Sequence, residues 1–319
     1  MRPPDRRRRA LLLPGTRGTS LAAADADTVV VMASPGPLGE YLRARRELLD
    51  PADVGLPVVG VRRTPGLRRE ELATLAGIST DYYLRLEQGR DRNPSRQVLE
   101  ALAGALHLDA AATAYLLTIP TAARPPRRAA PPARQSVPAG IRELLGTVGV
   151  PAFVEDRRFD ILATNELATA MDPSVVVGAN RLRTMFLDDR AAALWGDEER
   201  TRRDIVASFR VSIGADRGDA RTQLLVGELS LRSEEFRRLW ARHDVAVLAG
   251  GVARLDHPLV GPMHLRRHKF PVNDTDGLLL AMYHPAPGSA SAAAMEALRQ
   301  SLTGAAADPA SVDGDRDRA

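Results

Sequence analysis

The sequence predicts an α+β protein with two folded domains, an all-helical one over residues 38–118 and a mixed one over residues 139–303. A chain of 319 residues is long enough for both. Apolar residues recur at helical spacing in the first domain, whereas strand-like apolar runs occur in the second. Prolines interleaved with arginines indicate a stiff, charged linker over 119–138. We expect disordered segments over 1–37 and 304–319.

Five helices are expected in the first domain. Apolar stripes and capping residues predict them over 38–49, 68–75, 79–88, 95–106 and 109–118. Ser79 and Asp109 suit N-cap positions, and Gly89 suits the residue that follows a helix. Several prolines and glycines predict a loop over residues 50–66.

The second domain is expected to contain strands at both ends and helices between them. A hairpin is predicted over 152–163, and three strand-like runs lie at 245–255, 262–270 and 277–284. Helices are predicted over 141–147, 165–171, 187–194, 197–213, 219–230, 233–241 and 291–302. This order predicts a sheet with helices on one face.

The composition excludes several classes of site. The chain has no cysteine, which excludes disulfides, thiolate zinc sites and thiol nucleophiles. No apolar stretch reaches the roughly 18 residues that a membrane-spanning helix needs. Pro14 and Gly15 cut the apolar run near the start too short for a secretion signal. We therefore expect a cytoplasmic protein with no membrane partner.

A helix–turn–helix pattern occupies residues 67–95, LRREELATLAGISTDYYLRLEQGRDRNPS. Ala73 is small where one helix must let another pass closely. Gly77 follows four residues later, where the turn favours a residue that can adopt a positive φ. The two helices are expected to pack through Tyr83, Leu86, Leu72 and Leu75.

The outward face of the second helix is short and polar, as the major groove of DNA requires. Thr80, Asp81 and Arg85 are predicted to point into the groove. Arg85 suits a bidentate contact to guanine, worth roughly 1–3 kcal/mol of discrimination. Thr80 suits a thymine methyl or a base edge. Asp81 either accepts a hydrogen bond from a cytosine amine or caps the helix.

Other polar residues around this helix are expected to contact phosphates or to position the helix on DNA. They are Ser79, Tyr82, Gln88, Arg90, Arg92 and Asn93. The alternative is a solvated surface charge for each arginine and packing against the loop for Tyr82. Glu87 is expected to pair with an arginine inside the motif, because a carboxylate beside a phosphate repels it.

Several of these motifs resemble a known family. PGLRREELATLAG and STDYYLRLEQGRDRNPS resemble the lambda-repressor-like domain of the Cro/phage-repressor (XRE) regulators. VGELSLRSEEFRRLWARHDV (226–245) and HPLVG (257–261) extend the resemblance to the MmyB-like transcription regulators, over about 38–303. The resemblance implies that Arg69 clamps the DNA backbone. It also implies a PAS-like C-terminal domain that holds a small apolar, fatty-acid-like molecule.

Two segments depart from the family pattern. Thr164-Asn165 stands where the family often has Trp-Asn, and Leu265–His268 reads LRRH where the family often reads LDYE. The candidate ligand-binding residues are Phe153, Ile161, Phe186, Trp195, Phe209, Trp240, His243, Leu279 and Met282. Ordinary core packing is the alternative for the apolar ones, and a bond to a buried backbone group is the alternative for His243.

Cofactor and metal sites are not expected. His257, His264 and His268 lack the nearby carboxylates that would complete a metal site. Neither a phosphate-binding glycine loop nor a nucleophile elbow is present, and Gly250-Gly251 is expected to form a bulge or turn. The sequence therefore predicts a protein that is not an enzyme.

These observations predict a ligand-responsive transcription regulator. It is expected to act as a homodimer on two half-sites about 34 Å apart, because one recognition helix reads too few bases. One alternative is a constitutive repressor whose second domain only dimerises. Another is a small-molecule enzyme or carrier fused to a helical interaction module.

Overall fold

The computed structural model describes residues 36–57, 62, 64–91, 93–119, 135–214, 219–246 and 250–306. The described residues belong to one compact unit. Most of the predicted N-terminal extension, linker and C-terminal tail lie outside the described residues, as does Arg92. Within the described ranges, no helix has the length and apolar character needed to cross a membrane.

The N-terminal domain contains the five predicted helices. They are α1 (Pro37–Leu48), α2 (Arg69–Leu75), α3 (Thr80–Glu87), α4 (Arg96–Ala105) and α5 (Ala110–Thr118). A short 3₁₀ helix, η1 (Pro51–Val54), lies in the predicted loop. Ser79, Ser95 and Asp109 accept hydrogen bonds from backbone amides at the starts of α3, α4 and α5. The caps that the sequence predicted for α3 and α5 are confirmed.

Close packing of α1, α2 and α3 builds the core of this domain. A Cβ at Gly39 of α1 would overlap the carbonyl oxygen of Glu87, so only glycine allows this approach to the end of α3. Tyr83 and Leu86 are buried against Leu72, as expected. Leu75 is 40% exposed, which contradicts its predicted role. The buried face of α2 runs through positions 72, 73 and 76 and turns Leu75 outward.

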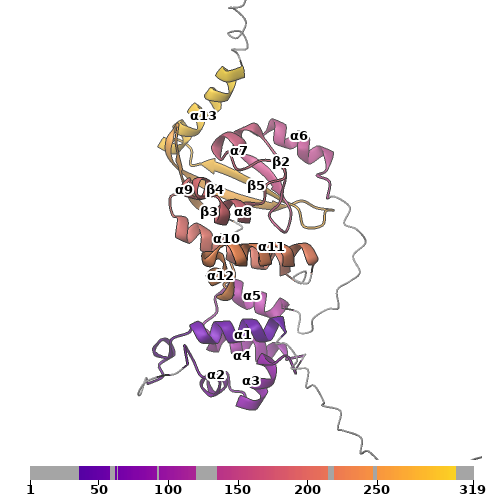
Figure 1. Ribbon diagram of the computed structural model, residues 1–319, viewed down its shortest axis with the longest axis vertical. Helices are drawn as coiled ribbons and strands as arrows, with labels where there is room; N and C mark the ends of the chain where they lie inside the picture. The colour runs from indigo at the N-terminus through magenta and orange to yellow at the C-terminus, as the bar shows by residue number, and fades with distance from the viewer. Residues whose placement is uncertain are drawn as a thin grey trace, which may run out of the picture. The chain divides into compact units, whose positions relative to one another are not determined.

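The C-terminal domain confirms the α+β class. Its strands are β1 (Ala152–Glu155), β2 (Ile161–Thr164), β3 (Gly250–His257), β4 (Gly261–Pro271) and β5 (Leu279–Pro285). They form one antiparallel sheet in the order β2-β1-β5-β4-β3 (Figure 1). The helices are α6 (Ala139–Thr147), α7 (Glu166–Met171), α8 (Arg181–Leu187), α9 (Asp189–Ala193), α10 (Glu198–Ile213), α11 (Ala220–Arg232), α12 (Glu234–Ala241) and α13 (Ala290–Ala306).

The two faces of the sheet pack differently. Alternate strand residues such as Phe153 and Tyr283 enter the main core with α7, α8, α10, α11 and α12. Val154 and Leu280 point to the opposite face, where Leu145 of α6 covers them. Figure 1 shows α6 on one side of the sheet and α10 and α11 on the other. The expectation of helices on a single face is therefore wrong for α6.

Two further local expectations are corrected. Helix α8 was not predicted; Asn180 begins it by accepting from the amides of Leu182 and Arg183. Gly250 and Gly251 form no turn, because they pair in register with His268 and Arg267 at the start of β3.

Candidate DNA-binding surface and ligand cavity

Helix α3 presents a polar face to solvent. Thr80, Asp81 and Arg85 are all exposed. Arg85 Nη1 lies 3.3 Å from Asp81 Oδ2 on the same face, and such exposed pairs are weak enough to exchange for another partner. The helix is capped by Ser79, whose Oγ lies 3.1 Å from the amide nitrogen of Tyr82. Asp81 therefore lies in the first turn and is not the N-cap.

The turn that precedes α3 has the predicted geometry. Gly77 has a φ of 66°, and the amide of Ile78 donates to the carbonyl oxygen of Ala73 at 3.0 Å. After α3, Gly89 has a φ of 67°, which confirms its predicted position beyond the helix. Gly77 forms the turn before α3, and Gly89 follows the end of the helix.

A buried carboxylate holds α3 from behind. Glu87 Oε1 lies 2.7 Å from Arg46 Nε, and Glu87 Oε2 lies 2.6 Å from Arg69 Nε. Arg46 also donates to the carbonyl oxygen of Leu67 at 2.7 Å. Burial raises the pKa of Glu87, but the hydrogen bonds from the two arginines outweigh burial and hold it below its ordinary value. This cluster links α1 and α2 to the end of α3.

The remaining predicted DNA-binding residues surround the exposed end of α3. Arg90 and Asn93 are exposed in the loop that follows. Tyr82 is half-buried, and the Arg85 guanidinium lies 5.7 Å from its ring centroid. Gln88 is also half-buried. Arg69 is 45% exposed although it is paired with Glu87, so its guanidinium is still accessible.

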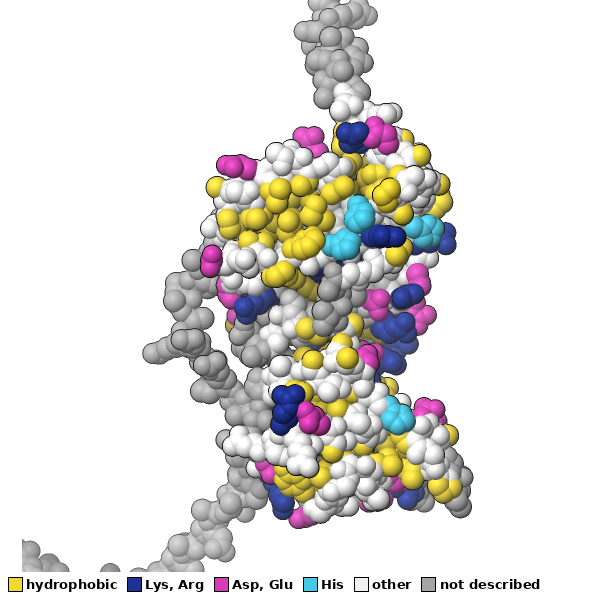
Figure 2. All heavy atoms as spheres, turned by 180° about the vertical axis from the view of Figure 1, so that it is seen from behind, with side chains coloured by type: hydrophobic (Ala, Val, Ile, Leu, Met, Phe, Trp, Pro, Cys, Tyr) yellow, Lys and Arg dark blue, Asp and Glu magenta, His cyan; other side chains and the backbone are white. Residues whose placement is uncertain are grey.

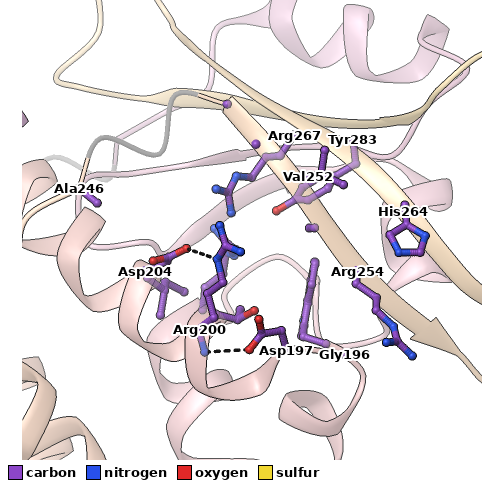
Figure 3. Close-up of a pocket in the computed structure, with 17 residues that line it drawn as sticks. Gly196, Asp197, Arg200, Asp204, Ala246, Val252, Arg254, His264, Arg267 and Tyr283 are labelled. Carbon is purple, nitrogen blue, oxygen red and sulfur yellow. Dashed lines mark hydrogen bonds and ion pairs between the residues drawn. The ribbon is translucent and has the colours of Figure 1, made fainter.

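The C-terminal domain contains a cavity of about 580 Å³ between α10 and the sheet (Figure 3). Its apolar walls include Trp195, Ile205 and Tyr283, and its polar walls include Arg200 and Arg267. Gly196 lies close to β3, since a Cβ there would lie 2.6 Å from an Asp256 carboxylate oxygen. The volume is in the range of small-molecule sites.

Among the described residues that line the cavity, Trp195 is the only predicted ligand residue. None of Phe153, Ile161, Phe186, Trp240, His243 and Met282 is among the described residues that line the cavity. The first three belong to the main core. Met282 lies on the α6 face of the sheet. The apolar pattern of the sequence did not indicate the arginines of the lining, because they are charged.

His243 and Trp240 instead surround a buried arginine. Arg210 of α10 is 1% exposed, and its Cζ lies 3.8 Å from the Trp240 ring centroid. Its Nη1 lies 3.2 Å from His243 Nδ1, and its Nη2 donates to the Trp240 carbonyl oxygen. Burial lowers the pKa of Arg210 to about 10.

The other histidines are engaged with protein groups or lie on the surface. His257 Nε2 lies 3.0 Å from the carbonyl oxygen of Ala170, and the Nε2 atoms of His268 and His284 lie 3.2 Å apart. Figure 2 shows histidine side chains beside hydrophobic ones on one face of the molecule. Among the described residues, no group of three or more metal-binding side chains comes together.

Two sequence profiles match the chain. A helix-turn-helix domain profile matches residues 37–116. The profile of the MmyB-like transcription regulator ligand binding domain matches residues 137–298, slightly more than half of the 319 residues. A search of curated proteins finds no match.

Proposed function

Because the chain belongs to the MmyB-like transcription regulators, we propose that it binds a specific operator through the exposed face of α3 and that a small molecule in its C-terminal domain controls this binding. The observation that carries the proposal is the position of Thr80, Asp81 and Arg85 on a helix whose inner side is locked by Glu87. A rigid support of this kind lets a few side chains select bases.

Each exposed residue has a specific role in this proposal. Arg85 exchanges its weak contact with Asp81 for the O6 and N7 atoms of a guanine. Thr80 contacts a thymine methyl or a base edge. Arg69, Arg90 and Asn93 contact phosphates on either side of the groove. Three base-reading positions are too few for a unique genomic site, so a homodimer that reads two half-sites completes the proposal.

A continuous set of contacts supports control by the second domain. Helix α10 lines the cavity with Arg200 and Ile205 and carries Arg210 five residues beyond Ile205. Arg210 contacts His243, whose neighbour Asp244 accepts from Arg45 of α1 at 2.6 Å. The next residue of α1, Arg46, holds Glu87 of α3. A ligand that shifts α10 therefore has a physical route to the recognition helix.

The DNA-binding half of the proposal is tested with Arg85→Ala and a matched control. Arg232 of α11 pairs with Glu228 at the same spacing and the same 3.3 Å distance as Arg85 with Asp81. We expect Arg85→Ala to weaken binding to the promoter of its own gene by roughly 10- to 100-fold. Arg232→Ala should bind as the parent does. Equal affinities of parent and Arg85→Ala would refute the assignment of Arg85.

The alternative to ligand control is a constitutive repressor whose second domain only dimerises. Native mass spectrometry of the purified protein separates the two. A dimer that carries a co-purifying small molecule supports the proposed regulator. A dimer that never carries one, in repeated preparations, supports the constitutive repressor.

A further inference from the structure

The cavity of the C-terminal domain carries positive charge that its own carboxylates do not balance. Its charged lining consists of Arg181, Arg200, Arg254, Arg267, Asp197 and Asp204. Arg254 has a partner beside the cavity, since its Nε lies 3.2 Å from Asp256 Oδ1. Asp197 is engaged as the N-cap of α10, where its Oδ1 lies 3.2 Å from the Arg200 amide.

A second excess of positive charge lies around Arg181, one of the residues that line the cavity. Glu155 is fully buried and receives both Lys269 Nζ at 2.5 Å and Arg181 Nη1 at 3.0 Å. One carboxylate therefore serves two cations. Both cations lie close to the Phe159 ring, at 4.6 Å for Lys269 and 6.0 Å for Arg181, which stabilises them only in part. The cluster keeps a net charge of about +1 inside the domain.

Arg267 is the least satisfied of the four arginines. Within the described part of the chain, no carboxylate lies within ion-pair distance of its guanidinium. Its Nε is buried and has no hydrogen-bond partner there. Gly251 on β3 lies beside it, and a Cβ at that position would make an ordinary van der Waals contact with Arg267 Nη2 at 3.8 Å.

Arg200 faces Arg267 across the cavity. Figure 3 shows the two side chains pointing toward each other from α10 and β4. The Arg200 guanidinium forms an ion pair with Asp204, whose Oδ2 lies 3.8 Å from Arg200 Nε, a distance too long for a hydrogen bond. Two guanidinium groups that converge in this way repel each other unless an anion lies between them.

We propose that the cavity binds an organic anion, with its carboxylate or phosphate group between Arg200 and Arg267 and its apolar body against Trp195, Ile205 and Tyr283. Guanidinium groups suit such oxyanions because their paired donors match the geometry of two oxygens. The proposal rests on the proposed function and assigns the residues that hold the charged group of its ligand. Arg267 belongs to the LRRH run, where the sequence departs from the pattern that the resemblance implies.

The test is calorimetric titration of the full chain with 2-naphthoate, 2-naphthyl phosphate and the uncharged 2-naphthalenemethanol. We expect at least one anion to bind about tenfold or more tightly than the alcohol. The tighter anion shows whether a carboxylate or a phosphate is preferred. Arg267→Gln and Arg200→Gln should each weaken that anion by roughly 10- to 100-fold. Arg299→Gln, the matched control, breaks an exposed pair with Glu296 on α13 outside the cavity and should stay within about twofold of the parent.

Three results would overturn the anion site: neither anion binds, the alcohol binds as tightly as the anions, or both Arg267→Gln and Arg200→Gln keep the parental affinity. The side chain of Arg200 is 70% exposed, so its replacement leaves the fold intact even if Arg267→Gln does not. The titration contains no DNA. A chain that binds the anions but not promoter DNA would therefore refute the proposed function and leave the anion site standing.

Discussion

At the scale of single residues, Glu87 determines how the recognition helix is held. Its side chain is 3% exposed and neutralises Arg46, which is 5% exposed. We expect Glu87→Ala to destabilise the N-terminal domain by about 3–5 kcal/mol, because Arg46 would remain buried without a counter-charge. Hydrogen exchange of the α1 and α3 amides measures this domain separately. Glu100→Ala, which breaks an exposed pair with Arg96, should cost less than about 1 kcal/mol.

The same residue makes the N-terminal domain sensitive to acid. The folded-state pKa of Glu87 is below the ordinary glutamate value of about 4.3, so its stabilisation is fully present above that pH. The stabilisation is lost as the pH falls through the folded-state pKa. In Glu87→Gln, α3 protection should therefore fall less steeply below about pH 4.3 than in the parent. If the hydrogen-exchange protection of α3 falls equally steeply with pH in the parent and in Glu87→Gln, another group controls acid unfolding.

At the scale of secondary structure, the turn between α2 and α3 depends on backbone conformation alone. Gly77 has a φ of 66°, and nothing lies within 4 Å of the position of an added Cβ. Gly77→Ala should therefore cost about 1–2 kcal/mol through backbone strain. Gly104, an exposed helical glycine in α4, has the same empty surroundings. Gly104→Ala should stabilise the domain by roughly 0.5–1 kcal/mol. Hydrogen exchange of the N-terminal domain measures both changes in stability. If Gly77→Ala and Gly104→Ala both stabilise or both destabilise the domain, this explanation is wrong.

The sequence predicted the helical domain better than the ligand site for a physical reason. Caps and turn glycines act locally, so Ser79, Gly77 and Gly89 are recognisable from their neighbours alone. The cavity depends on contacts between distant segments. Arg200 and Arg267 lie 67 positions apart in the chain and line one cavity only because the tertiary fold brings them together. Large aromatic residues such as Phe153 and Phe186 fill the core instead. No local sequence pattern distinguishes an aromatic residue in the core from one that lines a pocket.

At the scale of the whole molecule, the ion pair between Arg45 and Asp244 joins the recognition module to the ligand-binding domain within one compact unit. If ligand control passes through it, Asp244→Asn should keep the affinity of the cavity for 2-naphthoate or 2-naphthyl phosphate. Saturation with the bound anion should then change promoter affinity less than in the parent, where a coupling of about 5- to 150-fold is typical. Undiminished coupling in Asp244→Asn would show that control takes another route.

The central claim is that α3 reads DNA sequence. The most direct measurement is the ratio of affinities for promoter DNA and for a scrambled duplex, determined for the parent, Arg85→Ala and Arg90→Ala at one salt concentration. Arg85 is assigned to a base and Arg90 to a phosphate, so Arg85→Ala should lower the ratio by roughly 10- to 100-fold. Arg90→Ala should weaken both complexes equally and keep the ratio. A parent that binds both duplexes with equal affinity would contradict the account.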